Sequence, residues 1–193
     1  MIKAIIFDCF GVLTTESYDI FRDKYLGSDE PKRQIANKAM DDLNVGSISY
    51  EEFLKRLSQV SGAPQSQVLK VLEQNQPNTN LFDYIRFKLK PKYKIGMLSN
   101  AGADWISEIF EKADVDLFDN ITLSFRAGVI KPQPEAYQIV ARELGVLPEV
   151  CIFIDDRQKY CDGAEKAGMK SVLYDNFPQM KTDLEKILAA SDN

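Results

Sequence analysis

The stretch Ala-Ile-Ile-Phe-Asp-Cys-Phe-Gly-Val-Leu, residues 4 to 13, decides the fold and directs the search for a function. The apolar residues Ala4 to Phe7 predict a short strand that is buried on both faces, as in a parallel sheet. Asp8 follows at once, which places a carboxylate at the carboxyl end of that strand. A second apolar run, Cys151 to Ile154, ends in the same way in Asp155-Asp156. The sequence therefore predicts three carboxylates at one edge of a sheet.

Further strand-like runs occur downstream, and helical patterns separate them. The strand-like runs are Lys94 to Leu98, Ile121 to Ser124 and Lys170 to Tyr174, and the helical patterns are Asp104 to Lys112, Pro134 to Leu144, Gln158 to Ala167 and Gln179 to Ala189. This alternation predicts an α/β fold whose parallel sheet is covered by helices on both faces and joined by right-handed crossovers. Sheets of this kind bind ligands at the carboxyl ends of their strands.

The long interval between Asp8 and Ser99 contains no convincing strand. It shows amphipathic helical patterns instead, around Tyr18 to Tyr25, Lys32 to Leu43, Tyr50 to Val60 and Gln65 to Glu73. We expect residues 15 to 82 to form an all-helical domain that is inserted after the first strand and lies over the sheet edge. Residues 1 to 14 and 83 to 193 are then expected to form the α/β core domain.

Composition limits the partners and the compartment. The chain has 193 residues, 45% of them hydrophobic, and a net charge of -5, which argues against nucleic acid or an anionic membrane as the main partner. No run approaches the roughly 20 apolar residues of a membrane span, and the N-terminus does not resemble a signal peptide, so we expect a cytoplasmic protein. Cys9, Cys151 and Cys161 are not spaced as metal ligands and are expected to be reduced thiols. The oligomeric state stays open.

The chain contains no histidine. This absence excludes Ser-His-Asp and Cys-His nucleophilic sites, histidine metal sites and phosphohistidine chemistry. Proton transfer is left to carboxylic acids, lysine, tyrosine and cysteine.

Polar residues follow four successive predicted strands, where parallel strands would bring them to one edge of the sheet. In chain order they are Asp8, then Ser99-Asn100-Ala101-Gly102, which we expect to open a helix, then Lys131-Pro132, and finally Asp155-Asp156. This order suits a phosphate group bound beside a magnesium ion.

A transferring phosphoryl group needs an in-line nucleophile, donors for its oxygens and positive charge. Asp8 can attack phosphorus. Ser99 and the amides of Asn100 and Ala101 are expected to donate to the phosphate from a helix N-terminus, where backbone N–H groups are free. Lys131 supplies a cation beside both the nucleophile and the phosphate.

Two adjacent acids directly after an apolar strand are unfavourable without a cation. Asp155 and Asp156 offer hard oxygen ligands, which Mg²⁺ prefers, and Asp8 can hold the same ion with one of its two oxygens. We therefore expect Mg²⁺ as the cofactor.

These residues and their order resemble the haloacid dehalogenase superfamily of hydrolases. The matching segments are Phe7 to Leu13, Leu98-Ser99-Asn100, Lys131 to Tyr137, and Phe153 to Asp156 with Gly163-Ala164 and Ala167-Gly168-Met169. The resemblance extends from residue 3 to about residue 175, and the helical insertion matches the cap that such proteins carry after their first motif. It implies a Rossmann-like core with a helical cap, and hydrolysis of a small phosphorylated metabolite through an aspartyl-phosphate on Asp8.

The resemblance also implies the metal ligands. Mg²⁺ would be held by Asp8, by the main-chain carbonyl of Phe10 and by the pair Asp155-Asp156. The sequence leaves open which member of the pair binds the ion directly.

Two departures from the family pattern stand near this site. Phosphatases of the family carry a second aspartate two residues after the nucleophile as general acid and base, and this chain has Phe10 there. General acid–base help contributes typically about 10²–10⁴-fold, so we expect slow hydrolysis of alkyl phosphates unless another acid substitutes. Glu16 and Asp19 are the candidates. Tyr160 stands where relatives often carry asparagine, which would alter a hydrogen bond near the metal.

Two other functions remain open. A catalytically impaired binding or regulatory module would keep the metal and phosphate pocket without the acid. A 2-haloacid dehalogenase also lacks the second aspartate and carries an aromatic residue in its place, but it needs no metal, so the retained Asp155-Asp156 pair disfavours this alternative.

Overall fold

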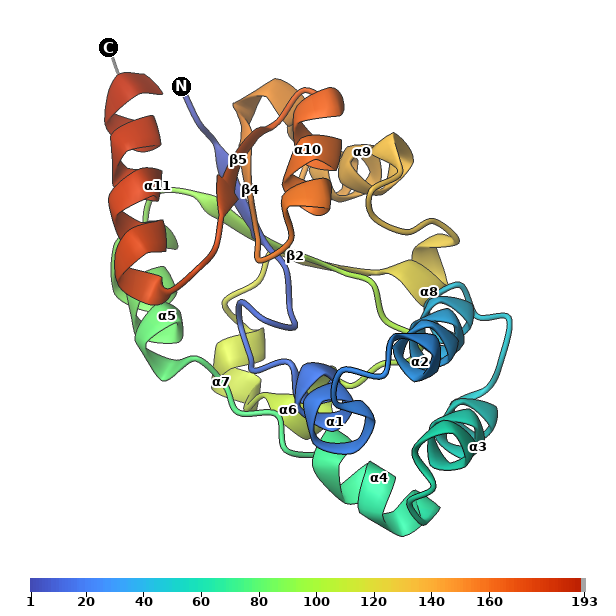
Figure 1. Cartoon of the computed structure of the whole chain (residues 1–193). Coiled ribbons are helices and arrows are strands. Elements are labelled where there is room, and N and C mark those ends of the chain that lie inside the picture. The colour runs from blue at the N-terminus through green and yellow to red at the C-terminus, as the bar shows by residue number, and fades with distance from the viewer. Residues whose placement is uncertain (192–193) are drawn as a thin grey trace.

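Five parallel strands form one sheet in the order β3-β2-β1-β4-β5 (Figure 1). The strands are β1 (Ala4–Phe7), β2 (Lys94–Ser99), β3 (Asn120–Leu123), β4 (Cys151–Asp155) and β5 (Lys170–Leu173). The computed structural model describes residues 1 to 191. β1 lies in the centre and pairs with β2 on one side and β4 on the other. The predicted parallel α/β fold is confirmed.

Successive side chains of β1 point to opposite faces of the sheet, and both faces are covered by helices. Ile5 and Phe7 pack against α5 (Thr79–Tyr84), the π-helical segment Ile85–Leu89 that continues it, and α11 (Phe177–Ser191). Ala4 and Ile6 pack against α9 (Pro134–Glu143) and α10 (Gln158–Lys166) on the other face. A strand that is buried on both sides reads as a continuous apolar run, which is what the sequence shows.

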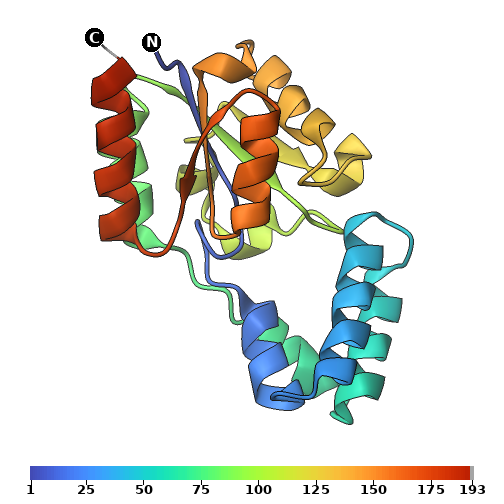
Figure 2. The same ribbon diagram turned by 45° about the horizontal axis from the view of Figure 1, so that its top comes forward.

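The helical cap has its own hydrophobic core. It consists of α1 (Ser17–Leu26), α2 (Glu30–Asn44), α3 (Tyr50–Ser61) and α4 (Gln65–Leu72), which correspond to the four predicted helical patterns. Phe21, Phe53 and Leu57 are buried between these helices, in a cluster that contains no residue of the sheet. Figure 2 shows the four helices, coloured blue to green, standing below the carboxyl edge of the sheet.

Two neighbouring linkers join the cap to the core. The N–H of Thr15 donates to the carbonyl of Gln76 at 3.1 Å, and the N–H of Asn78 donates to the carbonyl of Leu13 at 2.9 Å. α5, which follows the second linker, packs within the core cluster on one face of the sheet. On this packing we propose that the cap ends near Pro77, five residues before the boundary that the sequence suggested.

The segment after β2 differs from the prediction. A helix does not begin at Ser99: residues 100 to 105 are not helical, and the predicted helix over 104 to 112 is divided between α6 (Ile106–Ile109) and α7 (Lys112–Val115). Asn100 explains the difference, because its side chain accepts the N–H of Lys131 at 2.8 Å and donates to the carbonyl of Lys131 at 3.1 Å. These bonds hold the chain beside the loop after β3.

The remaining short helices are α8 (Ser124–Ala127) and the 3-10 turn Pro148–Val150. Within residues 1 to 191, no helix has the length and apolar character needed to cross a membrane. Cys9, Cys151 and Cys161 are buried free thiols.

Candidate active site

Lys131 joins two carboxylates at the carboxyl edge of the sheet. Its Nζ lies 2.7 Å from Asp8 Oδ1 and 2.6 Å from Asp155 Oδ2. The strand register brings the two acids together, because Phe7 of β1 pairs with Ile154 of β4, and one acid follows each of these residues. All three charged side chains are buried.

Asp156 completes a group of three carboxylates. Oxygens of Asp8, Asp155 and Asp156 lie within 4.8 Å of one another. Both oxygens of Asp155 are occupied, since Oδ2 binds Lys131 and Oδ1 accepts the N–H of Arg157 at 2.9 Å. Asp156 Oδ1 is buried and has no hydrogen-bond partner among the described residues, and the nearest guanidinium nitrogen, Arg157 Nε, is 4.0 Å away. The third carboxylate is therefore available to a ligand.

Gly11 allows the loop after β1 to approach Asp156 closely. A Cβ at this position would lie 2.6 Å from Asp156 Oδ2, and the backbone φ of +85° is one that other residues rarely adopt. The glycine thus keeps the backbone around Phe10 next to the third carboxylate.

The site is short of positive charge. Burial raises the pKa of Asp8, and the charge of Asp155 raises it further, while Lys131 opposes both effects. Burial also raises the pKa values of Asp155 and Asp156. Burial alone would lower the pKa of Lys131, but the carboxylates of Asp155 and Asp8 outweigh it and raise that pKa. Lys131 and the more distant Arg157 carry two positive charges against three carboxylates, so a divalent cation with a preference for oxygen ligands fits this donor set.

Ser99 offers an unused hydroxyl beside these charges. It ends β2, the neighbour of β1, and its Oγ is buried without a hydrogen-bond partner in the part of the chain that the structure describes. The N–H of Ala101 donates to Ser124 Oγ at 2.9 Å, and the side chain of Asn100 holds the backbone of Lys131. Of the predicted phosphate donors, the Ala101 amide is thus engaged with Ser124, Ser99 Oγ is unpartnered and Lys131 Nζ binds Asp8 and Asp155, while the backbone amide of Asn100 stays a prediction.

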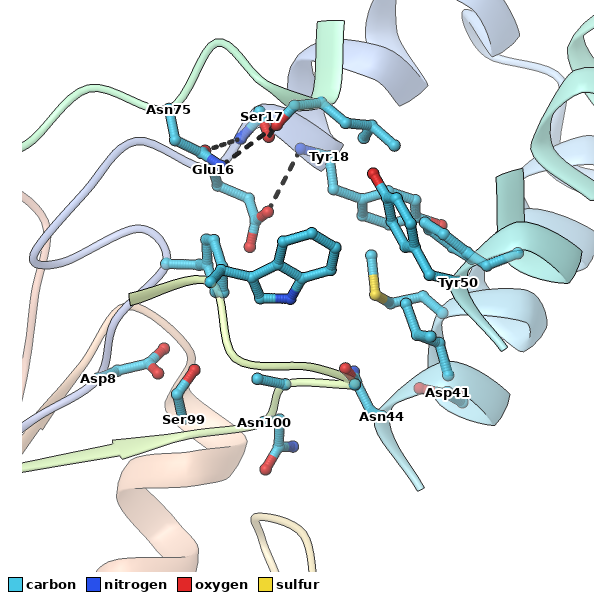
Figure 3. A pocket seen from close by; sticks show the side chains of 18 of the residues that line it. Asp8, Glu16, Ser17, Tyr18, Asp41, Asn44, Tyr50, Asn75, Ser99 and Asn100 are labelled. Carbon is cyan, nitrogen blue, oxygen red and sulfur yellow. Dashed lines mark hydrogen bonds between the residues drawn. The ribbon is translucent and has the colours of Figure 1, made fainter. Parts of the chain in front are cut away.

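A cavity of about 700 Å³ lies between the sheet edge and the cap (Figure 3). Asp8, Ser99 and Lys131 line its core end, and the aromatic residues Tyr18, Tyr50, Phe53 and Trp105 line part of the rest. Tyr50 of the cap and Trp105 of the core lie edge to face, with 4.6 Å between ring centroids. The cavity can therefore hold a phosphate at one end and a partly apolar group at the other.

Phe10 and Tyr160, the two departures from the family pattern, both line the cavity. Phe10 also packs against the core cluster and has no proton to transfer. The hydroxyl of Tyr160 lies 3.5 Å from Asn100 Nδ2, and its ring faces Lys131 Nζ at 4.8 Å from the centroid. Tyr160 thus places the face of its aromatic ring against the buried ammonium group of Lys131.

The two candidate acids occupy different places. Glu16 lines the cavity, and its Oε2 lies 3.5 Å from a guanidinium nitrogen of Arg157. Burial raises the pKa of Glu16 to about 8. Asp19 pairs with Arg22 at 2.5 Å and is not among the described residues that line the cavity.

Sequence reasoning missed two contributors to the site. Arg157 directly follows the acidic pair, and this adjacency was a usable signal. The sequence offers no comparable signal for Trp105, because a helical pattern does not reveal which residue of an irregular loop will face a cavity. Both residues line the cavity.

Comparisons with known proteins identify the family and agree with the fold. The family model for haloacid dehalogenase-like hydrolases matches residues 2 to 168. Phosphatase MT3486 of Mycobacterium tuberculosis is 27% identical over 207 residues, which cover 98% of this chain and 94% of that protein. D-ribitol-5-phosphate phosphatase of Bacteroides thetaiotaomicron is 26% identical over 211 residues, which cover 97% of this chain and 99% of that protein.

A solved structure shares the fold. It is a haloacid dehalogenase family enzyme of Bacteroides thetaiotaomicron in complex with magnesium and inorganic phosphate, with a TM-score of 0.71 and 24% identity over 90% of this chain and 94% of that one. The family model covers most of the chain, and the strand ends carry the expected acids, serine and lysine in order. The chain therefore belongs to the haloacid dehalogenase-like hydrolases.

Proposed function

We propose that this protein is a Mg²⁺-dependent phosphomonoester hydrolase that acts on a small phosphorylated metabolite through an aspartyl-phosphate on Asp8. The observation that carries this proposal is the buried contact of Lys131 with both Asp8 and Asp155 beside the unpartnered hydroxyl of Ser99. It combines a nucleophile, a cation and a hydroxyl donor at one end of a cavity. The similarity to two proteins named as phosphatases supports the same reaction class.

The occupied oxygens suggest how the acids divide their roles. Asp155 orients Lys131 and has no free oxygen, so we assign the metal to Asp8, Asp156 and the main-chain carbonyl of Phe10. The buried, unpartnered Oδ1 of Asp156 is the atom that fits a cation. A bound Mg²⁺ would offset negative charge on the acids and on the transferring phosphoryl group.

The protein groups around Asp8 favour attack by this residue. Its Oδ1 accepts the N–H of Cys9 at 2.7 Å and binds Lys131, which fixes the orientation of the carboxylate. Ser99 and Lys131 would donate to the phosphate oxygens as phosphorus transfers from the leaving oxygen to Asp8. Water then attacks the aspartyl-phosphate and releases inorganic phosphate.

A phosphate-release screen tests this function. Wild type with Mg²⁺ should hydrolyse at least one ester in a broad panel, and Asp8→Asn should abolish the turnover. Asp83→Asn is the matched control, because Asp83 is an exposed carboxylate on α5 outside the cavity. Turnover that survives in Asp8→Asn would contradict the assignment of the nucleophile.

The same assay separates the two alternatives. Halide release from 2-haloacids that persists in chelator would identify a dehalogenase. Mg²⁺ binding without hydrolysis of any ester, in wild type and in Phe10→Asp alike, would identify a binding module. Phe10 lines the cavity next to the nucleophile, so this substitution adds the missing acid at the reacting end.

A further inference from the structure

We propose that Glu16 is the general acid that protonates the leaving oxygen, in place of a carboxyl group at position 10. This inference rests on the phosphohydrolase function proposed above. The N-cap residue of α1 then becomes a catalytic residue. This role explains how the chain can do without an acid at position 10, where it has Phe10.

Glu16 is held firmly at the place where the chain enters the cap. It is the N-cap of α1, and its Oε1 accepts the N–H of Tyr18 at 3.3 Å. The next residue, Ser17, donates its N–H to Asn75 Oδ1 at 3.1 Å and its hydroxyl to the carbonyl of Leu72 at 2.7 Å. These bonds attach the start of α1 to the second linker, so the carboxyl group has a defined position (Figure 3).

The cavity places Glu16 on the side where the leaving group must lie. Asp8, Ser99 and Lys131 hold the phosphate at the core end, and an in-line attack sends the leaving oxygen away from Asp8, towards the cap. Figure 3 shows the carboxyl groups of Glu16 and Asp8 directed into the same cavity from opposite parts of its wall. Arg157 connects the two regions, at 3.5 Å from Glu16 and 4.0 Å from Asp156.

Other carboxyl groups suit this role less well. Asp41, Glu73 and Glu108 also line the cavity, but all three are exposed residues of the cap or the outer rim. The side chain of Glu16 is only 19% exposed. Asp19, the alternative candidate from the sequence, is paired with Arg22.

The surroundings of Glu16 keep it protonated near neutral pH. Burial is the main cause of its raised pKa, about 8, and the charges of Asp19, Asp8 and Asp156 add to it. The charge of Arg157 opposes these effects and favours the ionised form. An efficient general acid has a pKa near the working pH, so this balance suits a group that gives up a proton and takes it back.

Glu16 gives a proton in the first half of the reaction and recovers one in the second. As Asp8 attacks phosphorus, the bond between phosphorus and the leaving oxygen breaks, and that oxygen takes the proton of Glu16 and departs as an alcohol. The Glu16 carboxylate, facing Arg157, then accepts a proton from the water that attacks the aspartyl-phosphate. Inorganic phosphate leaves, and both acids return to their starting states.

Two substrate types separate this role from a structural one. Phenolate leaves without protonation when the phenol is acidic, whereas an alkoxide needs a proton. In Glu16→Gln we therefore expect kcat/KM to fall about 10²–10⁴-fold for an alkyl phosphate and by less than about tenfold for 4-nitrophenyl phosphate. Glutamine keeps the acceptor for the Tyr18 N–H, so the helix cap remains.

A burst experiment examines the second half of the reaction. With 4-nitrophenyl phosphate, Glu16→Gln should release about one equivalent of nitrophenol quickly and then turn over slowly, because the base for water is missing. Glu16→Asp should recover part of the alkyl phosphate activity. Asp19→Asn, which removes a neighbouring charge but not the acid, is the matched control and should keep the wild-type ratio of alkyl to aryl kcat/KM.

The outcomes of these experiments are distinct. Equal losses in Glu16→Gln for both substrates, or no loss for either, would overturn the role of Glu16. If Asp8-dependent hydrolysis of 4-nitrophenyl phosphate persists in that case, the proposed phosphohydrolase function still stands. If wild type hydrolyses neither substrate type, nor any ester of the panel, the proposed function itself fails.

Discussion

The Nζ atom of Lys131 lies 2.6 Å from Oδ2 of Asp155, and neither side chain is more than 1% exposed. A buried charge pair of this kind holds its geometry because each group is costly to leave without a partner. The same nitrogen reaches Asp8 at 2.7 Å. The lysine therefore has two tasks: it stabilises the carboxyl edge of the sheet, and it supplies charge for the proposed reaction.

Lys131→Met should remove both the stabilisation of the sheet edge and the positive charge beside Asp8. The substitution leaves two buried carboxylates facing one another without a cation, so we expect the free energy of unfolding to fall by about 3–5 kcal/mol near neutral pH. The loss should shrink in acid, where Asp8 and Asp155 take up protons. Urea denaturation at several pH values measures it.

Lys181→Met provides the control for that measurement. The side chain of Lys181 is 45% exposed and lies 4.0 Å from Glu185, so its removal should change the free energy of unfolding by at most about 1 kcal/mol. Equal effects of the two substitutions would show that the buried contact of Lys131 is not stabilising.

Asp155→Asn and Asp156→Asn should distinguish the residue that orients Lys131 from the residue that binds the metal. Asp155→Asn should lower the free energy of unfolding by about 1–3 kcal/mol, because Lys131 loses a charged partner, and should retain Mg²⁺ binding. Asp156→Asn should lose Mg²⁺ binding in calorimetry without a loss of stability in metal-free buffer, since its unpartnered oxygen contributes no hydrogen bond. If Asp155→Asn lost Mg²⁺ binding and Asp156→Asn lost stability, the roles of the two residues would be the reverse of those assigned here.

The sequence predicted the strand ends well and the loops poorly. Asp8 and Asp155 meet because adjacent parallel strands carry them at the same register, and apolar runs predict such strands. The predicted helix after Ser99 was wrong because long-range bonds from Asn100 to Lys131 fix that loop, and no local pattern reveals them. The burial of Glu16 depends on how the cap closes over the sheet, so its raised pKa required the structure.

Glu16→Gln should stabilise the protein in a pH-dependent way. The pKa of Glu16 is about 8 in the folded protein and ordinarily near 4.5, so the folded state binds this proton more tightly than the unfolded state. Wild-type stability should therefore fall as the pH rises through that interval, whereas glutamine has no proton to lose. The melting temperatures of the two proteins should agree at acid pH and diverge above it.

The size of that divergence can be read directly in thermal melts. For a chain of this length each kcal/mol corresponds to about 2–4 °C in Tm. Asp19→Asn serves as the control because the side chain of Asp19 is 40% exposed, against 19% for Glu16. A difference between wild type and Glu16→Gln that stays constant from acid to alkaline pH would contradict the buried, protonated state of Glu16.

Phe10→Asp should supply the acid of related phosphatases at the reacting end. In the Glu16→Gln background it should restore alkyl phosphate turnover, because an acid at either position can reach the cavity. In wild type the gain should be smaller, since Glu16 already performs the step. Phe10 packs against the core, so we expect a loss of about 0.5–3 kcal/mol in the free energy of unfolding. If the double variant did not recover alkyl phosphate turnover, the result would argue against Glu16 as the acid that replaces one at position 10.

Trapping the covalent intermediate tests the central claim most directly. Glu16→Gln should accumulate a phosphorylated form when mixed with 4-nitrophenyl phosphate and Mg²⁺, and mass spectrometry of the acid-quenched protein should place the phosphoryl group on Asp8, in the peptide that contains residues 4 to 13. The account predicts that this modification is absent from Asp8→Asn treated in the same way. A phosphoryl group on another residue, or turnover of the ester with no modified Asp8 at any quench time, would contradict it.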